Sequence, residues 1–204
     1  MNKLYNKILN AKFIPKTIGV LIVIFINWLF QSLLYMGITE KILKIFIDLV
    51  LFLGFFVIFN HITNFISAIV ISFIIAHTLN WIFNGHIFAL LKTFGNIKTE
   101  TEEFSFYLDN LKNRSTNESS ILLVATFGSM SRKELKKTSD LDIRVIRKEG
   151  FNNALRSSFF VLFERSNAFF NKFPLDIYLC DNMDCIEKLK ESPVPVYDPN
   201  QLLK

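Results

Sequence analysis

Two long stretches almost without charge constrain the fold of this chain most. Residues 17–36 run for about twenty positions without a charged side chain, roughly the length that a helix needs to cross the hydrocarbon core of a bilayer. Residues 42–83 are also strongly apolar, but as one helix they would measure about 63 Å, twice the hydrocarbon thickness. The stretch must therefore break. The polar pair Asn60-His61 is the expected break, giving segments at 42–59 and 62–83.

The composition favours a membrane over the alternative of buried core helices. The chain has 204 residues, 51% of them hydrophobic, and a mean hydropathy of +0.34. A domain of this size has too little polar surface to cover three such segments. Residues 1–98 hold eight lysines and two acids, which points to anionic lipid. Residues 99–204 have nearly balanced charges, which argues against general nucleic-acid binding.

The topology stays open at this stage. The lysine-rich N-terminus favours a cytoplasmic start, and the run 17–36 is long for a cleaved signal peptide. Three full spans would place the C-terminal half outside the cell. Two spans with one interfacial or re-entrant segment would return it to the cytoplasm, and residues 84–98 suit an interfacial stretch. We expect an integral protein of the cell membrane with its C-terminal domain in the cytoplasm.

A polar cluster lies at the end of the apolar region. His77, Asn80 and Asn84 fall at helical spacing on one face, and His86 follows them. One interpretation is a membrane-side site for a lipid head group or another substrate. The other is hydrogen bonding between helices.

The C-terminal half, 99–204, has the pattern of a separate small α/β (α+β) domain with a mixed sheet. Strands are expected at 121–127, 140–147 and 174–180, helices at 102–114, 131–137, 151–173 and 183–191, and an extended tail at 193–199. Its two cysteines, Cys180 and Cys185, match no zinc or CxxC pattern, so we expect two reduced thiols. The predicted fold class is thus an α-helical transmembrane region, 1–98, followed by this domain.

Acidic residues in the predicted strands suggest a metal site. Asp140 and Asp142 are two positions apart, so their carboxylates project side by side from one face and repel unless a cation lies between them. Such hard oxygen ligands suit Mg²⁺ bound to substrate phosphates. Gly128-Ser129 follows a strand, where backbone N–H groups can hold a phosphate. Asp176 lies inside an apolar strand, where an unpaired charge is costly, and could supply a third carboxylate.

These residues resemble the pattern of DNA polymerase β-like nucleotidyltransferases in their minimal form, over roughly residues 118–182. The resemblance implies that the Gly-Ser turn binds nucleotide phosphates, that the Asp pair coordinates two Mg²⁺ (with Mn²⁺ as a substitute), and that the third Asp joins the metal site and activates the acceptor hydroxyl. Those roles fall on Gly128, Ser129, Asp140, Asp142 and Asp176, with Arg132 near the phosphates. One departure is Lys133, where minimal members usually have Gly.

The sequence therefore predicts a membrane-anchored nucleotidyltransferase. It would move a nucleotidyl group from a nucleoside triphosphate to a hydroxyl of a membrane-associated acceptor, lipid-linked or protein, by a two-Mg²⁺ mechanism. The alternative is a catalytically silent, membrane-bound nucleotide sensor or interaction module. A Gly-Ser turn or an Asp-x-Asp alone is usually structural, so the prediction depends on their joint occurrence.

Overall fold

The computed structural model describes residues 7–11, 13, 15–33, 36–84, 98–189 and 191–203. The chain forms two compact units, Met1–Leu34 and Tyr35–Lys204. The first contains α2 (Lys16–Phe30), which ends where Gln31 adopts a left-handed backbone conformation with φ 43°. Its 15 residues rise about 22 Å, less than the thickness of the hydrocarbon core. The helix is therefore shorter than the predicted segment 17–36.

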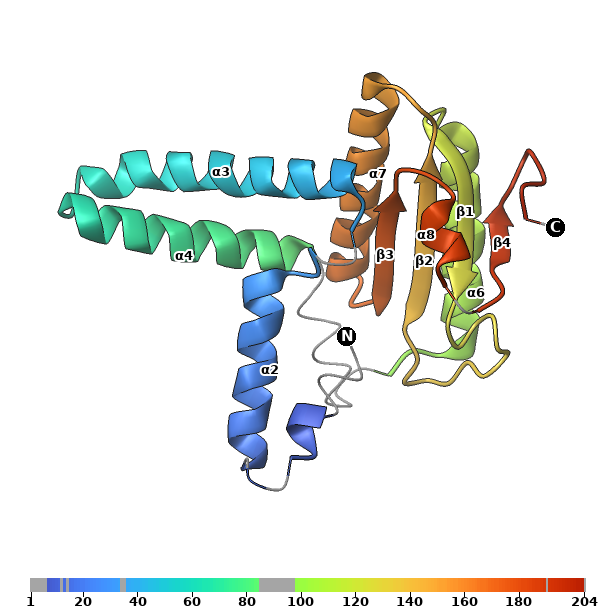
Figure 1. The fold of residues 1–204 in the computed structure, drawn as a ribbon, viewed down its shortest axis with the longest axis horizontal. Coiled ribbons are helices and arrows are strands. Elements are labelled where there is room, and N and C mark those ends of the chain that lie inside the picture. The colour runs from blue at the N-terminus through green and yellow to red at the C-terminus, as the bar shows by residue number, and fades with distance from the viewer. Residues whose placement is uncertain are drawn as a thin grey trace. The chain divides into compact units, whose positions relative to one another are not determined.

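The second unit begins with a helical hairpin, α3 (Ile38–Asn60) and α4 (Phe65–Phe83), shown in Figure 1. α3 ends at Asn60, where the sequence predicts a break, and α4 starts at the cap residue Asn64, whose side chain accepts a hydrogen bond from Ser67 N–H at 3.0 Å. Among the described residues, these two helices are long and apolar enough to cross a membrane. The predicted stretch 84–98, apart from its two end residues, lies outside the described residues.

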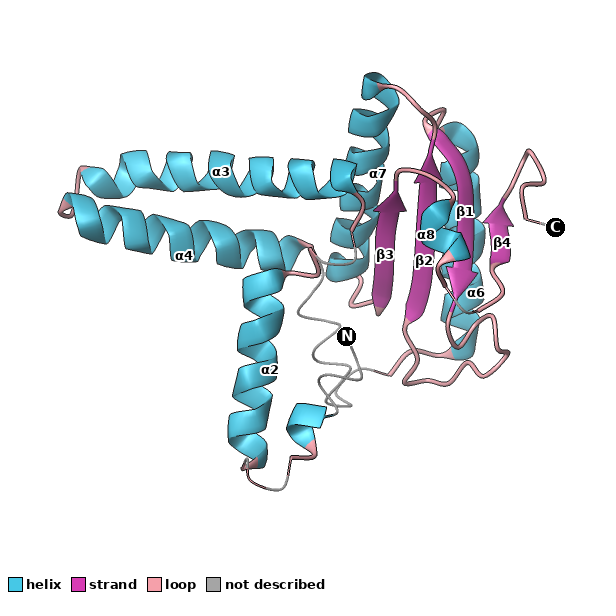
Figure 2. Cartoon of the chain, in the orientation of Figure 1, coloured by secondary structure: helices cyan, strands magenta, loops and turns pink. Residues whose placement is uncertain are grey.

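A four-stranded mixed sheet forms the rest of the second unit, in the order β3-β2-β1-β4. The strands are β1 (Ile121–Phe127), β2 (Leu141–Arg147), β3 (Leu175–Cys180) and β4 (Val194–Tyr197), drawn as magenta arrows in Figure 2. β1 pairs antiparallel with both β2 and β4, whereas β2 and β3 are parallel. The mixed sheet agrees with the predicted fold class.

Helices cover the two faces of the sheet unequally. α6 (Thr101–Asn117) and α7 (Phe151–Phe170) contribute to the larger core, which includes Phe104, Leu111, Val161, Ile143 and Leu179. The short helix α8 (Asp184–Glu187) packs Ile186 against Leu123, Ile146 and Cys180 in a smaller cluster. The second face therefore has the smaller of the two cores.

The predicted helix at 131–137 is wrong, because residues 128–133 form turns and residues 134–136 are irregular. Lys133 has φ 58°, a left-handed value that interrupts a right-handed helix. The chain instead runs from β1 to the antiparallel β2 through a loop, which needs no crossover helix. The element order is thus β-β-α-β-α-β rather than the predicted alternation.

The expectation of two reduced thiols is also wrong. Cys180 and Cys185 form a disulfide with a Cα–Cα distance of 6.1 Å. The reason is that α8 folds back onto the end of β3 and brings Cys185 within bonding range, although the two cysteines match no spacing motif.

Candidate functional site

Two of the three predicted acidic site residues lie next to each other on parallel strands. Asp142 of β2 and Asp176 of β3 are register partners. Their neighbours Leu141, Ile143 and Ile177 point into the core beneath α6 and α7. Because side chains alternate along a strand, Asp142 and Asp176 face the other side of the sheet, where both are half-buried. Asp140 lies just before β2 and is half-buried as well.

The Gly-Ser turn closes against this pair. Phe127, the last residue of β1, is paired with Asp142, so the turn begins beside the carboxylate. Gly128 has φ 66°, and a Cβ built there would overlap Oδ2 of Asp142 and lie 3.1 Å from its Cγ. Only glycine fits this position, for both conformational and steric reasons. The structure thus brings the predicted phosphate-binding turn and a predicted metal ligand into contact.

Ser129 adds an unsatisfied polar group to the turn. Its Oγ is buried and has no hydrogen-bond partner within the described residues. A buried hydroxyl without a partner is costly, and bound ligand is one way to satisfy it. The Ser129 carbonyl oxygen is already occupied, because it accepts a hydrogen bond from Glu134 N–H at 2.8 Å.

Glu191 is a site residue that the sequence did not reveal. Its Oε2 accepts a hydrogen bond from Gly128 N–H at 2.8 Å, and its Oε1 forms an ion pair with Arg132. Arg132 also contacts Glu134 at 3.1 Å. Hydrogen bonding to Glu134, with the charges of Glu191 and Glu134, raises the pKa of the Arg132 guanidinium above its ordinary value. The Glu191 carboxylate thus occupies two of the three residues that were predicted at the nucleotide phosphates, Gly128 and Arg132 but not Ser129. It lies 63 residues from Gly128, so no local pattern could indicate it.

The donor set is chemically suited to Mg²⁺, since Asp140, Asp142 and Asp176 supply the carboxylate oxygens that this ion prefers. The buried Ser129 hydroxyl, which has no partner within the described residues, is compatible with a phosphate ligand beside it. Within the described residues, however, no three His, Cys, Asp or Glu side chains are gathered closely enough to hold a metal ion.

The polar cluster at the end of α4 contacts α3 and the sheet domain. His77 Nδ1 lies 2.8 Å from Asp48 Oδ2, and Asn80 Nδ2 donates to Asp48 Oδ1 at 2.8 Å. Asn84 Nδ2 donates to Asn80 Oδ1 at 2.6 Å, and Asn84 Oδ1 accepts from Arg165 of α7 at 3.2 Å. The contacts with Asp48 and Arg165 join α4 to other helices, whereas the bond between Asn84 and Asn80 lies within the end of α4. A substrate site here stays a prediction, and the fourth predicted member, His86, lies outside the described residues.

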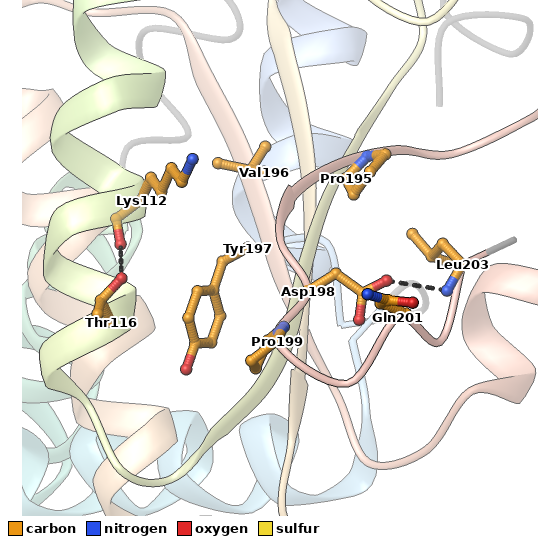
Figure 3. Close-up of a pocket in the computed structure, with 9 residues that line it drawn as sticks. All are labelled: Lys112, Thr116, Pro195, Val196, Tyr197, Asp198, Pro199, Gln201 and Leu203. Atoms are coloured by element: carbon orange, nitrogen blue, oxygen red, sulfur yellow. Dashed lines mark hydrogen bonds between the residues drawn. The ribbon is translucent and has the colours of Figure 1, made fainter.

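A cavity of about 600 Å³ lies away from the Gly-Ser turn and the acidic residues (Figure 3). It is lined by one face of α6, by β4 and by the C-terminal segment, including Lys112, Tyr197 and Leu203. Tyr197 pairs with Val124, in the middle of β1, whereas the Gly-Ser turn follows the end of that strand. None of the predicted site residues lines this cavity.

Comparison with known proteins agrees with the motif. Residues 108–195 match the family model of a nucleotidyltransferase domain. The match contains Gly128, Asp140, Asp142 and Asp176, and it supports nucleotidyl transfer as the general activity of this part of the chain. No curated protein and no solved structure matched the chain.

Proposed function

We propose that the chain is a membrane-anchored nucleotidyltransferase of the polymerase β-like type. The observation that carries the proposal is the contact of Gly128 with the Asp142 carboxylate, next to Asp176 on the neighbouring strand. This contact supports a single pocket, in which a bound triphosphate would lie beside the acidic residues that would hold its metal ions. The match to a nucleotidyltransferase domain supports the same reading.

In this proposal, Gly128 and Ser129 hold the phosphates through backbone N–H groups and the free hydroxyl, and Arg132 contributes positive charge. Asp140, Asp142 and Asp176 would hold two Mg²⁺, which supply neutralisation of the charge that develops on the pyrophosphate leaving group. Asp176, on the neighbouring strand, accepts the proton of the attacking acceptor hydroxyl. The nucleotidyl group passes to that oxygen.

The acceptor is proposed to be membrane-associated, either a lipid-linked molecule or a protein. Two helices long and apolar enough to cross a membrane support the anchor. As a hairpin they begin and end at the same side of the membrane. We place the catalytic domain on the cytoplasmic side because nucleotides and Mg²⁺ are supplied there. The division of the chain into a membrane region, 1–98, and a catalytic domain, 99–204, is part of the proposal.

The test uses the full chain in nanodiscs with Mg²⁺, its source membranes and each α-³²P-labelled nucleoside triphosphate. We expect label to move to a lipid or protein in the wild type and not in Asp142→Asn. Asp109→Asn, an exposed change on α6, is the matched control and should keep the activity. Nucleotide binding without transfer would support the silent sensor. If the wild type showed neither nucleotide binding nor transfer, a nucleotide site at Gly128 would be refuted.

A further inference from the structure

α7 carries an apolar stripe that is largely exposed among the described residues. Phe151, Leu155, Phe159 and Phe163 follow one another at every fourth position, so they line one side of the helix. Their exposed fractions are 81%, 44%, 52% and 63%, and Phe170 in the last turn is 71% exposed. We call these five residues the α7 stripe.

The α7 stripe is unusual because the opposite side of α7 is already buried in the core. Val161 and Ala168 are buried there against the sheet. A helix at the surface of a soluble domain normally turns a polar face to water. A helix that is apolar on both sides needs a second apolar environment, since contiguous exposed apolar surface of this kind marks an interaction site.

The hairpin of α3 and α4 indicates what this environment is. The Phe83 ring at the end of α4 lies 5.9 Å from the Phe169 ring and 6.5 Å from the Phe170 ring, centroid to centroid. The apolar surface of the hairpin therefore continues onto the end of the α7 stripe. Side chains along the hairpin are also exposed, among them Ile45, Leu49, Leu53, Val57 and Phe73.

Buried polar contacts fix the hairpin to α7 and β3. Glu40 at the start of α3 pairs with Arg165 of α7 at 2.5 Å, and both side chains are almost fully buried. Glu40 Oε2 also accepts a hydrogen bond from Leu179 N–H of β3 at 2.7 Å. Figure 1 shows α3 and α4 leaving α7 on the side away from the sheet and crosswise to its axis. If the hairpin crosses a bilayer, α7 lies along the surface of that bilayer.

We propose that α7 is an interfacial helix whose stripe rests in the boundary between lipid head groups and acyl chains. This inference rests on the membrane anchor of the proposed function and adds to it a second, lateral contact with lipid. Amphipathic helices of this kind bury their apolar face about 5–10 Å into that boundary. The catalytic domain would then be held against the membrane in one orientation.

The experiment places an environment-sensitive fluorophore at single added cysteines in the full chain, reconstituted in vesicles. The two native cysteines are joined in a disulfide, so they do not take the label. Phe159→Cys reports on the α7 stripe, Leu53→Cys on the hairpin, and Asn113→Cys, exposed on α6, is the control. Vesicles contain lipids with a nitroxide quencher either near the head group or near the chain end.

We expect the head-group quencher to reduce emission at position 159 by about twofold or more, and to leave position 113 unchanged. The chain-end quencher should act most strongly at position 53. Quenching at 53 but not at 159 would overturn the interfacial helix and leave the anchor intact. Quenching at 159 but not at 53 would keep the interfacial helix and remove the anchor. Crosslinking of two copies through position 159 without quenching would show that the stripe binds a second chain, which also overturns the proposal.

Discussion

Glu191 makes the sharpest prediction, because its carboxylate occupies groups that the nucleotide phosphates are proposed to use. It accepts a hydrogen bond from Gly128 N–H and pairs with Arg132. A triphosphate that binds to the turn must displace it. Glu191→Gln keeps an acceptor for Gly128 but removes the negative charge, so we expect the nucleotide to bind more tightly.

The magnitude follows from the exposure of the two partners. The side chains of Arg132 and Glu191 are 47% and 38% exposed, so water screens their ion pair and the pair adds little to the cost of displacing Glu191. The charge-assisted character of the hydrogen bond from Gly128 adds roughly 0.5 kcal/mol over a neutral one. Its loss corresponds to about a two- to threefold lower Kd for Glu191→Gln. Glu191→Ala also removes the hydrogen bond and should lower Kd by about tenfold.

The assay is a titration of the full chain in nanodiscs with a fluorescent, non-hydrolysable nucleoside triphosphate. Glu187→Gln is the matched control, since Glu187 is exposed on α8 and the change alters net charge equally. An unchanged or higher Kd in Glu191→Gln would refute the reasoning. It would mean either that the phosphates do not use the Gly128 N–H or that Glu191 itself helps to bind the nucleotide.

Three further predictions concern stability in detergent. Lys133→Gly should raise the free energy of unfolding by about 0.5–1 kcal/mol, because Lys133 has a φ of 58° that glycine adopts without strain; Lys136→Gly should not, and denaturant titration compares the two. Glu164→Gln should lower it by about 2 kcal/mol, because Glu164 is fully buried and accepts two hydrogen bonds from Arg114; a Tm unchanged from wild type would contradict this. For Asp181, burial opposes ionisation, but hydrogen bonds from Thr39 and Arg147 outweigh it, so its pKa lies below the ordinary 3.8. The contribution of ionised Asp181 to the free energy of unfolding is therefore complete above its unfolded pKa. This contribution is lost as the pH falls from 3.8 through the folded pKa. Asp181→Asn should remove this part of the pH dependence, measured by unfolding at several pH values.

The sequence predicted the elements whose signal is local. A short apolar run predicts the strand 121–127, and helical periodicity predicts the helix that begins at Phe151. In the structure, β1 begins at Ile121 and α7 begins at Phe151, as predicted. Gly128 and Asp142 were assigned to one site from the joint occurrence of the Gly-Ser turn and the Asp-x-Asp. They lie together in the structure because the end of β1 meets the start of β2 in an antiparallel pair.

The sequence did not predict features that depend on distant partners or on backbone conformation. The basic run 131–137 has helix-forming side chains, but the left-handed Lys133 decides its structure. Glycine would adopt this φ of Lys133 without strain. Glu191 and Glu40 contact residues 63 and 139 positions away, so their roles follow only from the folded sheet.

Glu40 links the proposed anchor to the strand that carries a proposed catalytic residue. β3 is the edge of the sheet, and Glu40 covers its open side by accepting the Leu179 N–H, while Gly37 N–H donates to the Leu179 carbonyl at 3.2 Å. The start of the same strand holds Asp176 beside Asp142. A flexible tether would need no buried ion pair such as that between Glu40 and Arg165. Removing one partner of a buried ion pair is costly, because it leaves the other charge buried and unpaired. The hairpin is therefore fixed to the catalytic domain by these contacts, and a change at the base of α3 should reach the acidic site through β3.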